Sequence, residues 1–314
     1  VLDRQMREVV RRVAALFPTA IISGRGRDKV EAFVQLKELC YAGSHGMDIA
    51  GPQIGLNGAV AADMAFQPAA HFKPLIDRVY TELRTRLAGI PGSTVEHNNF
   101  CVSAHYRNCC SERWHEVVAV VEEIVAVNPE LLMTRGRKVV EIRPKVAWHK
   151  GTALDHLLGV LGLRGAADVV ALYIGDDHTD EDAFKVLNDT KQGFGVLVST
   201  KIRDTAAAYT VRDPSEVQAF LQALIAWGET EHNGWLFNSA GQAINPHAAP
   251  STHGTSSPQQ SSLHWSQPQP HWGRPQPLTN GHAHPAGRVE PGHARAATGA
   301  WHATSGRGVA PVVC

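Results

Sequence analysis

The spacing of apolar residues predicts that buried strands alternate with amphipathic helices over the first 45 residues. Apolar side chains recur at the helical period over 1–16, and a short, uniformly apolar run follows at 19–23. A glycine turn, a helix over 27–36 and a second buried strand over 39–44 come next. Uniformly apolar strands are typical of a parallel sheet with helices on both faces. The pattern therefore predicts the start of an α/β core.

The pattern changes in the middle of the chain. Residues 94–107 alternate between polar and apolar and are rich in β-branched and aromatic side chains, which predicts an antiparallel strand. A helix is predicted over 112–127 and a strand over 137–142. We therefore predict an α+β cap domain at 46–143, inserted into the core.

The first pattern resumes at Lys150. Apolar residues at helical spacing predict a helix that begins there, and the next predicted elements are a buried strand over 169–174 and a helix over 180–187. Thr179 and Asp182 have the spacing of a capping box for that helix. A further strand and helix follow, so we predict that 1–45 and 144–242 form one core. A cleft between core and cap is the expected place for a ligand.

The end of the chain has a different composition. Residues 246–314 hold 10 of the 18 prolines and 8 of the 17 histidines, but only six Val, Ile, Leu, Met or Phe residues. Such a segment cannot bury enough apolar surface to offset the entropy lost on folding. We therefore predict a disordered tail over 243–314, and we expect that removal of residues 246–314 leaves the folded part intact.

The net charge, the apolar runs and the distribution of cysteines argue against some classes of protein. The 30 basic and 30 acidic residues balance, which argues against a general nucleic-acid binder. No run of about 18 apolar residues occurs, so a membrane span is not expected. The five cysteines are scattered and lack metal-ligand spacing, which favours reduced thiols and the cytoplasm. A plastid location stays open if a targeting peptide has been lost with the N-terminus. We expect a monomer.

Candidate metal-binding and phosphate-binding residues lie where the predicted core strands end. Asp176, Asp177 and Asp180 follow the buried strand over 169–174, and crowded carboxylates at a strand tip suit a hard cation such as Mg²⁺. Ser23 precedes a glycine and a helix N-terminus, where a phosphate oxygen can bind. Lys150 can neutralise an anion, although by its spacing alone a solvated lysine is the simpler interpretation.

This order of residues resembles the haloacid dehalogenase superfamily of phosphatases, and more narrowly the plant-type trehalose-6-phosphate phosphatases. The resemblance extends over 1–240. It rests on strings that the fold alone does not demand: Phe-Pro-Thr-Ala-Ile-Ile-Ser-Gly-Arg at 17–25, Tyr-Ala-Gly-Ser-His-Gly-Met-Asp at 41–48, Phe-Gln-Pro-Ala at 66–69, Phe-Cys-Val-Ser-Ala-His-Tyr-Arg at 100–107, Glu-Ile-Arg-Pro at 141–144 and Gly-Asp-Asp-His-Thr-Asp-Glu-Asp-Ala-Phe at 175–184.

The resemblance implies a Rossmann-like core with an inserted cap, and Mg²⁺-dependent hydrolysis of trehalose 6-phosphate through an aspartyl-phosphate. It implies that Ser23 binds the phosphate and that Lys150 holds it and orients the nucleophile. Asp176 would ligate Mg²⁺ with Asp177 and Asp180 in support. Residues implied to contact the substrate come from both core and cap: Gly24, Arg25, His45, Glu96 and Glu141.

The Asp-x-Asp-Gly-Thr motif that supplies the nucleophile in the family is missing from these 314 residues. We therefore expect a chain that is truncated before the nucleophile and is inactive by itself. Two alternatives stay open. One is a phosphatase for another sugar phosphate, and the other is a non-catalytic regulator that binds a sugar phosphate.

Overall fold

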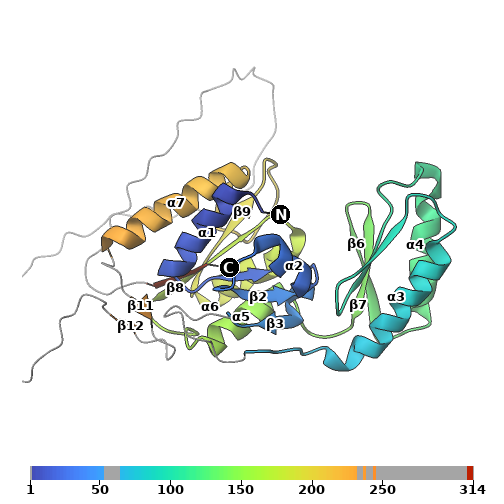
Figure 1. Ribbon diagram of the computed structural model, residues 1–314, viewed down its shortest axis with the longest axis horizontal. Coiled ribbons are helices and arrows are strands. Elements are labelled where there is room, and N and C mark those ends of the chain that lie inside the picture. Colours follow the sequence, from blue (N-terminus) through green and yellow to red (C-terminus); the bar gives the residue numbers. More distant parts are fainter. Residues whose placement is uncertain (1, 53–63, 232–235, 238–242, 245–309, 314) are drawn as a thin grey trace, which may run out of the picture. The chain divides into compact units, whose positions relative to one another are not determined.

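The computed structural model describes residues 2–52, 64–231, 236–237, 243–244 and 310–313 (Figure 1). Its first helix, α1 (Arg4–Leu16), has an Asp3 side chain that accepts a hydrogen bond from the backbone N–H of Met6. Strand β1 (Ala20–Ile22) pairs in parallel with β2 (Cys40–Gly43), and α2 (Arg27–Val34) connects the two. The chain then reverses, and β3 (Asp48–Ala50) pairs antiparallel with β2.

A second sheet is formed by the later part of the core. Its strands are β8 (Val169–Gly175), β9 (Gly193–Val198), β10 (Tyr209–Val211) and β13 (Ala310–Val313), in the order β10-β9-β8-β13. All three pairings are parallel. The accompanying helices are α5 (Lys150–Val160), α6 (Glu181–Thr190) and α7 (Pro214–Glu231). A short antiparallel pair, β11 (Leu236–Phe237) and β12 (Ala243–Ile244), follows α7.

Helices cover both faces of this second sheet. Successive side chains of a strand point to opposite faces, and β8 shows this directly. Leu172 packs in the cluster that α1 and α7 contribute to, whereas Tyr173 packs with α5 and α6 through Leu158 and Phe184. Figure 1 shows α1 and α7 along one side of β8 and β9. This arrangement explains why the core strands are uniformly apolar in sequence.

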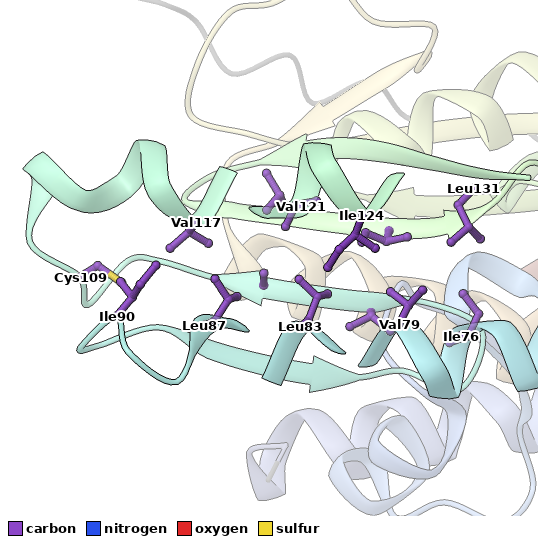
Figure 2. Packing of buried hydrophobic residues seen from close by; sticks show 14 residues of the cluster. Ile76, Val79, Leu83, Leu87, Ile90, Cys109, Val117, Val121, Ile124 and Leu131 are labelled. Carbon is purple, nitrogen blue, oxygen red and sulfur yellow. The ribbon is translucent and has the colours of Figure 1, made fainter. Parts of the chain in front are cut away.

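The cap is an antiparallel sheet with two helices on one face. Its strands are β4 (Thr94–His97), β5 (Val102–His105), β6 (Leu131–Gly136) and β7 (Val139–Pro144), in the order β4-β5-β7-β6. The helices are α3 (Lys73–Leu87) and α4 (Trp114–Ala126). Figure 2 shows the apolar cluster between helices and sheet, to which Leu83, Val121 and Ile124 contribute.

The two faces of the cap sheet differ in chemistry because side chains alternate along each strand. Val102, Ala104, Val140 and Ile142 point into the apolar cluster. The residues between them lie on the opposite face, where Ser103 stands opposite both Glu96 and Glu141 in the strand register. The cap therefore presents a polar face that carries both candidate glutamates.

Two local predictions need correction. Residues 94–107 form the hairpin β4–β5 and not one strand, because the chain reverses at 98–101, where Asn99 adopts a left-handed φ of 63°. The predicted capping box of Thr179 and Asp182 is not formed. Asp177 and Asp180 instead form a capping box at the start of the 3₁₀ turn (His178–Asp180) that precedes α6.

The predicted tail, 243–314, lies outside the described residues except at 243–244 and 310–313. The second of these segments is β13, which adds a parallel neighbour to β8 with Ala310 opposite Val169. All described residues belong to one compact unit. The predicted boundaries of the cap stay a prediction, and β3, which falls inside them, pairs with the core strand β2. Among the described residues, no helix is long and apolar enough to cross a membrane.

Candidate active site

A buried ion pair lies where β8 ends. Lys150, the first residue of α5, donates a 2.8 Å hydrogen bond from Nζ to Oδ1 of Asp180. The hydroxyl of Tyr173 donates to the same oxygen at 2.8 Å, and the backbone N–H of Asp177 donates to Oδ2 at 2.8 Å. A Cβ at Gly175 would come within 2.3 Å of Asp180 Cγ, so glycine is needed for the carboxylate to fold back under the strand end.

The additional hydrogen-bond donors around Asp180 offset the cost of burying the Lys150–Asp180 ion pair. Lys150 is 7% exposed and Asp180 is 4% exposed. Removing two charges from water is costly unless further hydrogen bonds satisfy their remaining sites. Tyr173 and the Asp177 backbone supply these bonds, so both oxygens of Asp180 are engaged. Asp180 therefore acts first as the residue that orients Lys150.

Asp176 and Asp177 are exposed at the strand tip, close to the buried pair. The Asp177 side chain is 53% exposed, and its partial burial is the largest single influence on its pKa and favours the neutral form. The positive charge of His178, the hydrogen bonds from that residue and the charge of Lys150 oppose burial, and together they lower the pKa of Asp177 below its usual value. Asp177 is therefore ionised at neutral pH.

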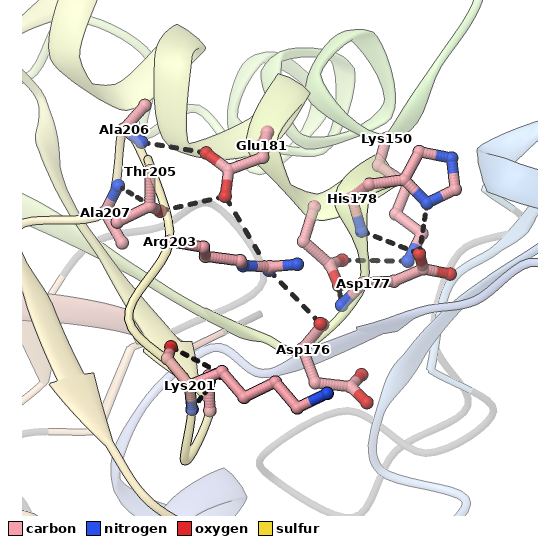
Figure 3. Close-up of polar contacts among 12 residues, drawn as sticks. Lys150, Asp176, Asp177, His178, Glu181, Lys201, Arg203, Thr205, Ala206 and Ala207 are labelled. Atoms are coloured by element: carbon pink, nitrogen blue, oxygen red, sulfur yellow. Dashed lines mark hydrogen bonds and ion pairs between the residues drawn. The ribbon is translucent and has the colours of Figure 1, made fainter.

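A neighbouring loop braces this strand tip (Figure 3). The Arg203 guanidinium donates to the backbone carbonyl of Asp176 at 3.2 Å and lies 3.7 Å from the Glu181 carboxylate. Glu181 also accepts from the Thr205 hydroxyl and the Ala206 backbone N–H, each at 2.8 Å. Glu181 thus fastens the loop to the start of α6.

The donor set at this tip suits a hard cation. In the described part of the chain no hydrogen bond engages the Asp176 carboxylate, and the side chain is exposed. Oxygen ligands from carboxylates are those that Mg²⁺ prefers. Asp176 could hold such an ion with Asp177 beside it, whereas the oxygens of Asp180 already accept three hydrogen bonds.

Ser23 and Gly24 lie at the end of β1, where the chain turns toward α2. Ser23 Oγ accepts a 3.2 Å hydrogen bond from the backbone N–H of Arg25, and its carbonyl accepts one from the backbone N–H of His45 at 2.8 Å. Gly24 lies so close to the His45 ring that a Cβ there would come within 2.8 Å of it. Among the described residues the Ser23 hydroxyl donates to no acceptor, so its proton is available to a ligand.

His45 joins the core to the cap. Its backbone has a left-handed φ of 57°, and its Nε2 lies 2.9 Å from Oε1 of Glu141 in β7. The Ser103 hydroxyl lies 3.3 Å from the other oxygen of Glu141. Cys101, fully buried nearby, has its pKa raised well above the usual value, first by burial and then by the charge of Glu141, while Arg143 opposes the rise.

A pocket of about 750 Å³ opens between α2 and the polar face of the cap sheet. Arg25 and Lys29 line it from the core, and Glu96 and Arg107 are among the residues that line it from the cap. Lys29 Nζ donates to Glu96 Oε1 at 2.8 Å, to the carbonyl of His97 at 2.5 Å and to Asn98 Oδ1 at 2.9 Å. Lys29 therefore ties α2 to the cap hairpin.

The pocket contains a carboxylate that is held ionised. Burial, the largest influence on Glu96, favours its neutral form, but Lys29 and His105 each contribute a hydrogen bond and a positive charge. Their combined effect lowers the pKa of Glu96 below its usual value. Glu96 therefore presents acceptor oxygens to the pocket at neutral pH.

The candidates predicted from sequence fall into three groups. Lys150 and the three aspartates meet at the tip of β8, Ser23 and Gly24 meet His45 and Glu141, and Arg25 shares the pocket with Glu96. Sequence reasoning missed Lys29 and Tyr173. A tyrosine inside a buried strand needs a partner for its hydroxyl, and that signal could have identified Tyr173.

The sequence of this chain is similar to those of known proteins. The sequence model described as trehalose-phosphatase matches residues 1–215. The chain is 50% identical over 227 residues to trehalose-phosphate phosphatase B of Arabidopsis thaliana, a match that covers 72% of this chain and 61% of the relative. It is 50% identical over 229 residues to trehalose 6-phosphate phosphatase RA3 of Zea mays, covering 71% and 63%. The chain thus spans about three fifths of the length of these relatives.

Solved structures support the same fold. One is titled a trehalose-6-phosphate phosphatase related protein, with a TM-score of 0.61 and 21% identity over 73% of this chain and 90% of that one. The C-terminal domain of a C. albicans trehalose-6-phosphate phosphatase gives a TM-score of 0.57 at 21% identity, covering 71% and 84%. The likeness confirms the predicted α/β fold class. With the family match over 1–215, it shows that the chain belongs to the trehalose-phosphatase family, with the fold of the haloacid dehalogenase superfamily.

Proposed function

We propose that this chain binds trehalose 6-phosphate and contributes the phosphate-binding, metal-binding and sugar-binding residues for its hydrolysis to trehalose and phosphate. The observation that carries the proposal is the buried Lys150–Asp180 pair beside the exposed carboxylate of Asp176. A lysine held in place by a buried acid keeps its charge in a fixed position. That is the requirement for stabilising charge on a transferring phosphoryl group.

Lys150 and Ser23 are proposed to bind the phosphate. The ammonium group of Lys150 has three N–H donors, and the hydrogen bond to Asp180 Oδ1 uses one of them. Ser23 Oγ accepts from the Arg25 backbone, so its own proton can be donated to a phosphate oxygen. Asp180, with Tyr173 behind it, serves as a positioning residue for Lys150.

Asp176 and Asp177 are proposed to hold Mg²⁺, with Asp180 as a supporting residue that acts through Lys150. The ion would supply positive charge to the phosphate oxygens. Asp176 is the principal ligand in this proposal because its carboxylate is exposed at the end of β8. Arg203 keeps the backbone at this position in place.

The polar face of the cap is proposed to bind the disaccharide. Sugar hydroxyls need fixed acceptors, and a carboxylate offers about four lone-pair sites. Glu141 uses some of these sites for His45 and Ser103, and Glu96 uses some for Lys29 and His105. The remaining sites are held in fixed directions by these contacts. Arg25, with Gly24 and His45, completes the set from the core.

The nucleophile is the part of the reaction that these residues do not supply. The sequence contains no Asp-x-Asp-Gly-Thr motif, and neither Ser23 nor Lys150 can replace a carboxylate nucleophile. Phosphate release by residues 1–314 should therefore be far slower than that of a version preceded by a segment with this motif. Comparable rates for the two would contradict this part of the proposal.

Binding by calorimetry tests the proposal without requiring turnover. Trehalose 6-phosphate should bind in the presence of Mg²⁺ more tightly than glucose 6-phosphate, trehalose or inorganic phosphate. Glu141→Gln should weaken binding of the disaccharide phosphate and leave that of inorganic phosphate unchanged. Glu130→Gln, at an exposed position outside the site, is the matched control. Equal affinity for several sugar phosphates would instead favour a phosphatase or regulator with another substrate.

A further inference from the structure

Three side chains of types that bind metal ions meet where the core touches the cap. His45 lies in the 3₁₀ turn (Ser44–Gly46) after β2, Cys101 directly precedes β5, and Glu141 lies in β7. One ligand atom of each residue lies within 4.8 Å of those of the other two. Cys101 is fully buried and His45 is 9% exposed. These residues are close in space but come from three separate segments.

The fold holds each of the three side chains in place. His45 adopts a left-handed φ of 57°, which is unusual for a residue other than glycine and indicates a position fixed by its surroundings. The strand register pairs Ser103 with Glu141, so Cys101 and Glu141 lie on the same face of the cap sheet. His45 Nδ1 is buried and has no hydrogen-bond partner among the residues that the structure describes.

We propose that His45, Cys101 and Glu141 form a binding site for a zinc ion that fastens the cap to the core. Imidazole, thiolate and carboxylate are the ligands that Zn²⁺ takes in proteins, and three of them leave a fourth position for water. Mg²⁺ is disfavoured because it prefers oxygen ligands alone. The site is therefore chemically distinct from the group of aspartates at the tip of β8.

The geometry is close to that of a zinc site. Bonds of about 2.0–2.3 Å in a tetrahedral arrangement place ligand atoms about 3.3–3.8 Å apart. His45 Nε2 and Glu141 Oε1 are 2.9 Å apart, so metal binding would separate them by about 0.4 Å. An approach of about 1 Å by the Cys101 sulfur brings the longest separation, at most 4.8 Å, close to that range.

Charge and proton balance are satisfied without any further reactant. The Cys101 thiol releases its proton to solvent, and the sulfur lone pair forms the bond to zinc. His45 binds through Nε2 as neutral imidazole, and the proton that Nε2 shares with Glu141 moves to Nδ1. The thiolate and the Glu141 carboxylate together carry two negative charges, which offset the charge of Zn²⁺. The ion thereby replaces the hydrogen bond between His45 and Glu141 with two bonds to metal.

The site spans two parts of the fold, because His45 follows the core strand β2, whereas Cys101 directly precedes the cap strand β5 and Glu141 lies in the cap strand β7. A bound ion would restrict movement of the cap. It would also compete with a sugar for Glu141, a consequence that rests on the proposed function. Metal binding itself is measured without any sugar, so failure of one proposal is distinguishable from failure of the other.

Cobalt(II) serves as the spectroscopic probe, since a sulfur-to-cobalt charge-transfer band appears only if a thiolate binds. The full chain with Cys110→Ser and Cys314→Ser is titrated, so that neither of these two thiolates can join the histidines at 246–314 in binding cobalt and produce the band. We expect a one-to-one charge-transfer band that zinc abolishes, and a higher Tm with zinc. Both should be lost in Cys101→Ser and weakened at least about 100-fold in His45→Gln, since loss of even an outer partner of a metal site costs 10–100-fold.

Cys40→Ser is the matched control, because Cys40 is also buried, in β2, and burial raises its pKa to about 12. This variant should keep the band and the zinc-dependent Tm. A band that persists in Cys101→Ser, or no stoichiometric band in the parent, overturns the proposal. If Cys101→Ser fails to fold by circular dichroism, His45→Gln decides, and unchanged cobalt affinity in that variant also overturns it.

Discussion

Lys29 and Glu96 form an ion pair in which the α2 lysine reaches the first strand of the cap, with 2.8 Å between Nζ and Oε1. The same ammonium group donates to the His97 carbonyl and to Asn98 Oδ1. All three N–H donors of Lys29 are thus used by one hairpin. The pair is a core-to-cap contact that involves none of the sequence-predicted phosphate-binding or metal-binding residues.

Replacing Lys29 with methionine should lower the free energy of unfolding by about 1–2 kcal/mol. Hydrogen bonds to a charged group contribute about 1.5–3 kcal/mol each, but the Lys29 side chain is 34% exposed and solvent screens part of that contribution. Urea unfolding at neutral pH measures the change. Lys185→Met, at an exposed position of α6, is the control and should change stability by less than about 0.5 kcal/mol. Equal effects of the two changes would mean that the contact is not stabilising.

Asp180→Ala should destabilise the fold by about 3 kcal/mol or more. The change leaves the Lys150 ammonium buried without a counter-charge, and breaking one partner of a buried pair costs about 3–5 kcal/mol. A double change, Lys150→Met with Asp180→Leu, should recover much of that loss because it removes both charges. Chemical unfolding of the wild type, Lys150→Met, Asp180→Leu and the double variant gives the coupling energy. A coupling near zero would show that the two side chains do not interact.

Glu96→Gln should make the free energy of unfolding depend less on pH in the acid range. Folding lowers the pKa of Glu96 below its usual value of 4.5, so folding favours the ionised form. This stabilisation is fully present above about pH 4.5 and is lost as the pH falls through the lower, folded-state pKa. The glutamate is partly exposed, so we expect a difference of no more than about 1 kcal/mol at pH 7. Urea midpoints of wild type and variant should differ at pH 7, and the difference should shrink as the pH falls below about 4.5. A difference that grows with acid would contradict the assignment.

Removal of residues 307–314 should lower Tm by about 4–8 °C. The parallel pairing of β13 with β8, Ala310 opposite Val169, satisfies backbone groups of β8 that would otherwise lose their partners. A loss of about 2 kcal/mol corresponds to that shift in a chain of this size. Deletion of an equal number of residues within 270–277 is the control, and its composition predicts no change. The sequence-based expectation that the whole tail can be removed without effect would be upheld if the two deletions behave alike.

The core could be predicted from sequence because its signals are local. The uniformly apolar run at 19–23 contains β1, and the helical spacing after Lys150 gives α5 with the predicted first residue. The hairpin at 98–101 was not predictable from alternation alone, because β4 and β5 continue the same alternating pattern on both sides of the reversal. Asn99, with its left-handed φ, is the residue whose side chain tolerates that conformation.

The sequence was enough to predict most of the residues that belong to the candidate site, but not which of them contact each other. Lys150 alone is most simply interpreted as a solvated lysine, and the structure buries it. Its partner Asp180 lies 30 positions away in sequence, and Tyr173 joins it from within a strand. Such contacts depend on how β8 packs against α5 and α6, which periodicity does not specify. Lys29 was missed for the same reason, because its three acceptors lie on another part of the fold.

The alternation of side chains in the cap sheet places the residues that stabilise the cap on one face and the polar residues on the other. Substitutions on these two faces should therefore differ in their effect on stability. Val102 and Ile142 hold the sheet against its helices, whereas Ser103 and Glu141, their immediate neighbours, do not enter that apolar cluster. Substitutions at the polar positions can therefore accumulate without loss of the cap's own core. A library restricted to those positions would vary recognition on an unaltered scaffold, and natural divergence within the family can follow the same route.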